Sequence, residues 1–148
     1  MAGEAKAVRP AILLVDHGSR RAAANESLSA MAELVRERGD ALVSFAHMEL
    51  CPPDIASACS ELVEAGATSI TVQPFMLSAG RHAMEDIPRM VGDVAAQHPH
   101  IAFHVTAPLG VHTLLAELVL LRVSESRSSN GSVDEDKPVF HGEGHTLE

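Results

Sequence analysis

Four short apolar segments that alternate with segments of helical periodicity constrain the fold of this chain more than any other feature. The apolar segments are Ala11–Asp16, Ala41–Ala46, Thr68–Gln73 and Ile101–Thr106. Each has the length of a typical buried strand. Strands that alternate with helices in this way form a parallel sheet with right-handed crossovers. The sequence therefore predicts an α/β fold with about four parallel strands flanked by helices.

The segments between these strands carry the spacing that is typical of helices. Apolar residues recur at helical intervals over 25–38, and further helices are expected over about 52–65, 82–97 and 111–123. Pro88 lies inside the third of these four segments. Because proline removes a backbone donor, we expect it within the first two turns of that helix, or before a later helix start.

The composition changes after Val123. Residues 124–132 are polar and rich in serine, and 134–136 form an acidic cluster. This pattern predicts a single folded domain over 1–123, followed by a flexible tail over 124–148. The tail contains His141-Gly-Glu-Gly-His145. Two histidines in a tail are a weak metal-binding pattern, so they are left out of the predicted site.

Charge and hydropathy exclude several classes of partner. The formal net charge is -9, no basic stripe is present, and aromatic residues make up only 3% with no Trp or Tyr. Nucleic acid is therefore disfavoured as a partner. No apolar run approaches the ~20 residues of a membrane span. With two cysteines and no secretory signal at its start, the chain is expected in the cytoplasm. The plastid stroma stays open if a transit peptide has been removed.

Histidines follow the ends of all four predicted strands. They are His17, His47, His82 and His112, and Glu49 lies beside the second of them. In a parallel sheet, the carboxyl ends of the strands share one edge, and ligands bind there. Imidazole and carboxylate ligands suit borderline divalent metals such as Fe²⁺, Co²⁺, Ni²⁺ and Zn²⁺. The spacing fits no closed tetrahedral site, so we expect open and transient metal binding.

Positive charges gather in two of the same loops of this acidic chain. They belong to Arg20, Arg21, Arg81 and Arg89. Helix N-termini at the same edge add partial positive charge and free N–H groups. These features predict a pocket for a small molecule that carries carboxylates or phosphates.

Four motifs in order give the chain a resemblance to a known family. They are His17-Gly-Ser-Arg20, His47-Met-Glu49-Leu, Gly80-Arg-His82-Ala-Met-Glu-Asp86-Ile-Pro88 and Ala107-Pro-Leu-Gly-Val-His112. Each motif alone is short, but together they resemble the small CbiX/SirB-type sirohydrochlorin chelatases over about 11–123. That family comprises sirohydrochlorin ferrochelatases and cobaltochelatases.

The resemblance implies a flavodoxin-like chelatase fold, commonly assembled as a homodimer. It also implies an enzyme that inserts Fe²⁺ into sirohydrochlorin to form sirohaem. By position, His17 and His82 would handle the metal and the pyrrole protons, assisted by Glu49. Neutral imidazole can ligate a metal or accept a proton near pH 7. The anionic arms of the substrate would be held by Ser19, Arg20, Arg81 and Arg89.

Other functions stay open at this point. Within the same class, the chain could be a cobaltochelatase or insert Ni²⁺; in another class, it could be a non-catalytic carrier of a tetrapyrrole or a metal. A nucleotide-binding module is disfavoured because the loop after the first strand has just one glycine, Gly18.

The metal is expected as a substrate, with no permanently bound cofactor. Plant members carry a cysteine-rich extension with an iron–sulfur cluster. This tail has no cysteine, so no cluster is expected.

Three residues near the predicted site keep two interpretations each. His47 and His112 either support the site or are ordinary surface residues. Asp16 either accepts a hydrogen bond from the neighbouring His17 or merely ends the first strand.

Overall fold

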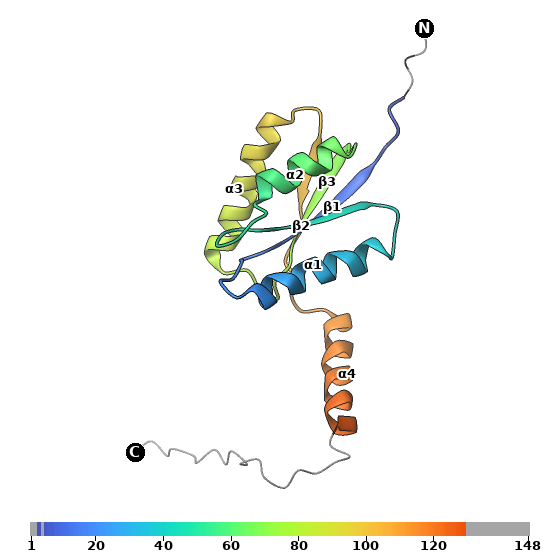
Figure 1. Cartoon of the computed structure of the whole chain (residues 1–148), viewed down its shortest axis with the longest axis vertical. Coiled ribbons are helices and arrows are strands. Elements are labelled where there is room, and N and C mark those ends of the chain that lie inside the picture. Colours follow the sequence, from blue (N-terminus) through green and yellow to red (C-terminus); the bar gives the residue numbers. More distant parts are fainter. Residues whose placement is uncertain (1–2, 4, 130–148) are drawn as a thin grey trace. The chain divides into compact units, whose positions relative to one another are not determined.

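The protein is described by a computed structural model that covers residue 3 and residues 5–129. The chain divides into two compact units, Met1–Val111 and His112–Glu148. The first unit contains the whole sheet and three helices, and the second contains one described helix (Figure 1).

The sheet of the first unit has four parallel strands. They are β1 (Pro10–Asp16), β2 (Leu42–His47), β3 (Ser69–Pro74) and β4 (Ala102–Val105), in the spatial order β2-β1-β3-β4. The predicted α/β fold is confirmed, and each strand boundary lies within one residue of the predicted one. β4 is two residues shorter than predicted, pairs with β3 alone and is largely exposed.

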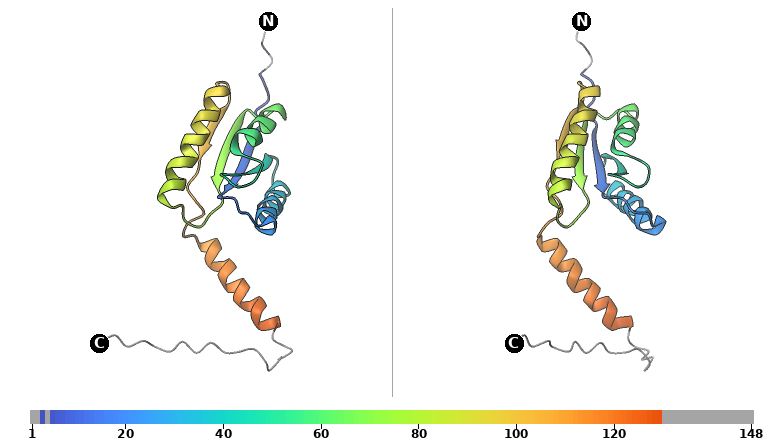
Figure 2. Two further views of the ribbon diagram at one scale, coloured as in Figure 1. Left: turned by 60° about the vertical axis from the view of Figure 1, so that its left-hand side comes forward. Right: turned by 90° about the vertical axis from the view of Figure 1, so that its left-hand side faces the viewer.

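Three helices cover the two faces of the sheet (Figure 2). α1 (Ala22–Arg36) packs on one face, and α2 (Ile55–Glu64) and α3 (Arg81–Gln97) pack on the other. Side chains of successive β1 residues point to opposite faces. Leu13 therefore packs against α2 and α3, whereas Leu14 packs against α1.

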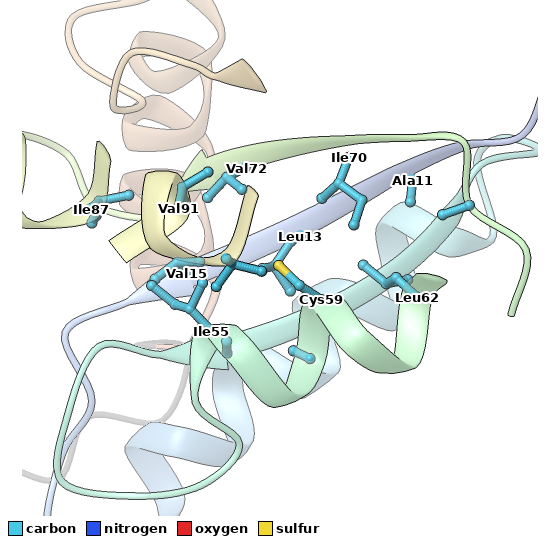
Figure 3. Close-up of a cluster of buried hydrophobic side chains, with 14 of the residues drawn as sticks. Ala11, Leu13, Val15, Ile55, Cys59, Leu62, Ile70, Val72, Ile87 and Val91 are labelled. Carbon is cyan, nitrogen blue, oxygen red and sulfur yellow. The ribbon is translucent and has the colours of Figure 1, made fainter. Parts of the chain in front are cut away.

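The larger core cluster lies between the sheet and the α2–α3 layer (Figure 3). Leu13, Ile70 and Val72 from the strands meet Cys59 from α2, and all four are fully buried. Burial raises the pKa of the Cys59 thiol to about 11, because the charged thiolate would lose its hydration there. Cys59 therefore packs as a small apolar side chain rather than as a metal ligand.

The start of α2 differs from the predicted one. The helix begins at Ile55, three residues after the predicted start, because Asp54 is its N-cap. The Asp54 Oδ1 accepts a hydrogen bond from the Ser57 backbone N–H at 2.8 Å. The peptide bond between Pro52 and Pro53 is cis.

The expectation for Pro88 is wrong. α3 begins at Arg81, so Pro88 is its eighth residue and lies beyond the first two turns. A proline inside a helix costs about 3 kcal/mol. The buried face of α3, which includes Ala83, Ile87 and Val91, outweighs this cost by packing against the sheet.

The second unit contains α4 (Thr113–Ser129). His112 precedes this helix, and its Nδ1 accepts a hydrogen bond from the Leu114 backbone N–H at 3.1 Å. The helix passes Val123, so the prediction of a flexible tail from residue 124 is wrong for 124–129. There, serine hydroxyls donate to carbonyls three or four residues earlier, and Arg122 pairs with Glu125.

The His141-Gly-Glu-Gly-His145 segment and the rest of 130–148 lie outside the described residues. Within the described part of the chain, no helix is both long enough and apolar enough to cross a bilayer.

Candidate active site at the carboxyl ends of the strands

The strand order brings three predicted site residues to one edge of the sheet. β1 lies between β2 and β3, and all three strands run in the same direction. His17 follows β1, Glu49 follows β2, and His82 is the second residue of α3, after the β3 loop. All three side chains are exposed. Each can therefore reach a ligand that lies across this edge.

Backbone hydrogen bonds join the loops that follow β1 and β2. The Met48 N–H donates to the Asp16 carbonyl at 2.9 Å, and the Glu49 N–H donates to the His17 carbonyl at 3.3 Å. These bonds continue the contact between the two strands past their ends. As a result, His17 and Glu49 occupy neighbouring backbone positions.

Gly18 makes this close approach possible. Its φ of 86° is in the left-handed region that favours glycine. A Cβ at this position would lie 1.9 Å from the Glu49 carbonyl oxygen. No side chain fits there without moving the second loop. The glycine of the His-Gly-Ser motif therefore holds the His17 and Glu49 loops together.

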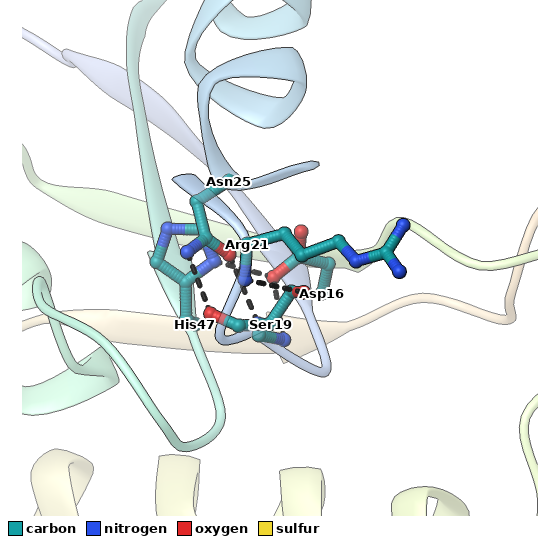
Figure 4. A network of polar contacts seen from close by, with 6 residues as sticks. Asp16, Ser19, Arg21, Asn25 and His47 are labelled. Carbon is teal, nitrogen blue, oxygen red and sulfur yellow. Dashed lines mark hydrogen bonds and ion pairs between the residues drawn. The ribbon is translucent and has the colours of Figure 1, made fainter. Parts of the chain in front are cut away.

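Asn25 of α1 orders the rest of the first loop (Figure 4). Its Oδ1 accepts from the Ser19 N–H at 2.9 Å, and its Nδ2 donates to the Ser19 carbonyl at 2.7 Å. The Ser19 Oγ accepts from the Arg21 N–H at 3.1 Å. The sequence analysis missed Asn25. Its signal was an amide side chain in the first turn of the helix that follows the motif.

Asp16 and His47 form a polar pair at the ends of β1 and β2, in which His47 is buried and the Asp16 side chain is 23% exposed (Figure 4). The His47 Nδ1 and the Asp16 Oδ1 are 2.5 Å apart, and His47 is 1% exposed. The same Asp16 oxygen accepts from the Gly18 N–H at 3.0 Å. For each of these residues, one of the two predicted interpretations is wrong. Asp16 bonds to His47 and not to His17, and His47 is a buried residue rather than a surface residue.

The loop after β3 is bonded at its start, where the Met76 and Leu77 carbonyls accept from the loop after β4, but it is held less tightly where α3 begins. Gly80 is the N-cap of α3 and has no side chain to cap the helix, and Arg81 and His82 are exposed in the first turn. Arg81 lies 3.5 Å from the Glu85 carboxylate, and Arg89 forms a similar contact with Asp86 at 3.3 Å. Exposed pairs of this kind are weak and are screened by salt. Both guanidinium groups can therefore turn to an anionic ligand.

The structure brings together only some of the predicted metal-handling residues. His17 and Glu49 are joined through their backbones. His82 lies at the neighbouring strand end, on another loop. Over residue 3 and residues 5–129, no three His, Cys, Asp or Glu side chains are gathered closely enough to hold a metal ion. The described part of one chain therefore holds no assembled metal centre.

Two pockets flank this edge. One has a volume of about 520 Å³ and is lined by residues 47–54 and Ser57, so Glu49 lies on its wall. The other has a volume of about 250 Å³ and is mainly apolar. It lies between α3 and the end of β4, with Ala83, Ile87 and Val105 among its lining residues.

These features define an α/β protein with an open, histidine-bearing edge that suits a metal and an anionic ligand. Residues 11–126 match the model of the CbiX family. The chain belongs to this family, and the resemblance predicted from its four motifs is confirmed.

Two relatives are named as metal chelatases. The chloroplastic sirohydrochlorin ferrochelatase of Arabidopsis thaliana is 41% identical over 126 residues, which cover 84% of this chain and 56% of that protein. The sirohydrochlorin cobaltochelatase of Methanopyrus kandleri is 33% identical over 137 residues, which cover 78% of this chain and 96% of that protein. The chain thus spans little more than half the length of the Arabidopsis relative.

A solved relative has the same fold. It is the sirohydrochlorin chelatase SirB from Bacillus subtilis subspecies spizizenii in complex with cobalt. The TM-score is 0.74 at 30% identity, and the match covers 80% of this chain and 51% of that chain. The predicted flavodoxin-like chelatase fold is therefore confirmed.

Proposed function

We propose that this chain is a sirohydrochlorin ferrochelatase that inserts Fe²⁺ into sirohydrochlorin to form sirohaem. The main support for this proposal is the close contact between the His17 and Glu49 loops, which backbone hydrogen bonds and Gly18 hold at the edge where His82 also lies. Membership in the CbiX family and the names of the relatives support the same chemistry. The metal is a substrate in this reaction, and no resident cofactor is proposed.

His17 and His82 are the proposed metal-handling pair. Insertion requires the metal to lose water and two pyrrole N–H protons to leave the ring. An exposed neutral imidazole can present the metal or accept a proton near pH 7. Glu49 has its backbone bonded to that of His17, so its carboxylate is well placed to orient the metal or relay a proton.

Ser19, Arg20, Arg81 and Arg89 are the proposed residues that hold the anionic arms of the substrate. The three guanidinium groups are exposed, and two of them form only weak contacts with acids of their own helix. The Ser19 Oγ accepts one hydrogen bond, so its own hydroxyl proton can donate to a carboxylate. Arginine suits this task because its planar fork matches a carboxylate.

A homodimer is the proposed assembly. The described residues of one chain gather no set of three metal ligands, and three site residues face outward at an open edge. A second copy would cover this edge and exclude water from the inserted metal. Sedimentation of the protein with and without sirohydrochlorin tests this assembly.

The cytoplasm is the proposed compartment, with the plastid stroma as the alternative because the Arabidopsis relative is named as chloroplastic. Imaging of the tagged protein in its own cell distinguishes the two.

Neither nucleic acid nor a membrane is proposed as a partner. The alternative metals are Co²⁺ and Ni²⁺, since a relative is named as a cobaltochelatase and SirB was solved with cobalt.

Anaerobic metal insertion into sirohydrochlorin, followed by absorbance, tests the function. Fe²⁺, Co²⁺ and Ni²⁺ are compared in parallel with wild type, His17→Ala and His82→Ala. We expect wild type to exceed the spontaneous rate and both variants to lose at least about 100-fold in rate. His100→Ala is the matched control, because this exposed histidine lies before the amino end of β4, at the opposite end of the strands from the proposed site.

The same experiment separates the competing functions. Relative rates with the three metals decide between a ferrochelatase and a cobaltochelatase or nickel chelatase. A wild-type protein that binds the ring tightly but matches the rate without protein is a carrier, and the catalytic proposal is then wrong.

A further inference from the structure

His47 is unusual among the core residues of this protein. Within the described part of the chain, it is the sole polar or charged side chain that is fully buried. The apolar ring of Phe45, two residues earlier on the same strand, lies edge-on to its imidazole with the ring centroids 5.8 Å apart. Burying an imidazole beside a partly buried carboxylate is costly, and replacing a buried polar pair with packed apolar residues is often neutral or stabilising. Stability alone therefore does not account for the Asp16–His47 pair.

The position of the pair links it to the site. Asp16 and His47 are the last residues of β1 and β2, and they are direct partners in the strand register. The next residue after Asp16 is His17, and Glu49 follows two residues after His47. Each member of the pair therefore lies directly before one of the two loops that carry a proposed metal-handling side chain.

The contacts of the pair reach both loops. The Asp16 Oδ1 accepts from His47 Nδ1 at 2.5 Å and from the Gly18 N–H at 3.0 Å. The Asp16 carbonyl accepts from the Met48 N–H at 2.9 Å. The His47 N–H donates to the Pro53 carbonyl at 2.9 Å, which closes the 48–53 loop onto its own strand. The two residues thus join the ends of both loops.

We propose that Asp16 and His47 are positioning residues, which hold the His17 and Glu49 loops in the arrangement that metal insertion requires. This inference rests on the proposed function. The carboxylate fixes a proton on His47 Nδ1 and at the same time fixes the Gly18 amide. Because a misplacement of about 1 Å can cost about 100-fold in rate, loosening this pair affects turnover more than substrate binding.

The test compares His47→Leu, His47→Asn and Val43→Ala with wild type. Leucine fills the site but offers no donor to Asp16, whereas the asparagine side-chain amide can donate from near the Nδ1 position. Val43 is buried in β2 against α1 and touches neither loop, so Val43→Ala is a control for general weakening of the strand. Urea unfolding confirms that each variant is folded under the assay conditions.

Two readouts separate positioning from folding. Amide hydrogen exchange is measured at Gly18 and Glu49, and kcat and KM are measured for metal insertion. In His47→Leu we expect exchange at both amides to accelerate by at least about 10-fold, and kcat to fall by about 10- to 100-fold with KM changed less than about threefold. His47→Asn should recover part of both losses, and Val43→Ala should show neither.

The outcomes are distinguishable from a failure of the proposed function. If exchange at Gly18 and Glu49 is unchanged in His47→Leu, or if it accelerates while kcat is unchanged, the positioning role is wrong. If Val43→Ala reproduces the kcat loss, the effect is general and the role is again wrong. If wild type shows no turnover, the proposed function fails, and the exchange data alone decide whether the pair holds the loops.

Discussion

The two halves of the candidate site are built differently. The half formed by the loops after β1 and β2 is fixed by two backbone hydrogen bonds, a required glycine and the Asp16–His47 pair. The half formed by the start of α3 presents Arg81 and His82 on an exposed first turn with weak ion pairs. One half is preorganised, and the other can adjust to the substrate. This division suits the proposed reaction, because the backbone that carries His17 and Glu49 is fixed while His82 and Arg81 can adjust to a large ring.

The largest effect is expected when the fixed half is forced open. In Gly18→Ala, the added Cβ meets the Glu49 carbonyl oxygen at 1.9 Å, in a left-handed conformation that alanine rarely adopts. We expect insertion activity to fall by at least about 100-fold and the free energy of unfolding to fall by more than about 1 kcal/mol. The measurements are the insertion rate and urea unfolding.

Gly92→Ala is the matched control for this prediction. Gly92 lies inside α3, and a Cβ there meets nothing within 4 Å. We expect this variant to keep its activity and to gain about 0.5–1 kcal/mol in stability. Normal activity in Gly18→Ala would show that the close approach of the two loops is not needed for insertion.

A smaller effect is expected in the adjustable half. Arg81→Gln removes one positive charge at the rim, where the substrate arms are proposed to bind. We expect KM for sirohydrochlorin to rise by about 3- to 10-fold with kcat little changed, because one charge-assisted hydrogen bond is lost. The difference from wild type should shrink at high salt. Arg38→Gln, at the end of α1, is the control for a lost surface charge. An unchanged KM would remove Arg81 from the substrate site.

The smallest effect is expected where the fixed half joins α2. Hydrogen bonds from Ser57 hold the pKa of the Asp54 carboxyl below its usual value of 3.8. A lowered folded-state pKa stabilises the fold above the unfolded value, and this stabilisation is lost as the pH falls through the folded value. Asp54→Ala should therefore lower the free energy of unfolding by about 1 kcal/mol at neutral pH, and by less at an acidic pH below the lowered pKa. Urea unfolding at both pH values checks this, and an equal loss at both would contradict the charged cap.

The sequence predicted the sheet and the edge where the site lies, because both depend on local patterns. Apolar runs such as Ala11–Asp16 are read directly, and parallel strands then bring His17, Glu49 and His82 to one edge. The Asp16–His47 pair was missed because its members are 31 positions apart and meet only in the correct strand register. The position of Pro88 was also missed, since tertiary packing decides how long α3 is. Likewise, local serine hydrogen bonds extend α4 to Ser129 against the composition.

The Asp16–His47 pair also affects how the chain selects its fold. β1 and β2 both carry apolar residues on their two faces, so burial of apolar side chains alone discriminates weakly between alignments that differ by two residues. In the observed alignment, Asp16 lies opposite His47. A slip of two residues would keep the apolar faces inward but would separate the buried imidazole from its carboxylate partner, at about 1–3 kcal/mol for the unpartnered imidazole. The two side chains that end the strands thus favour the correct alignment. A misaligned sheet has a higher free energy even when no ligand is present.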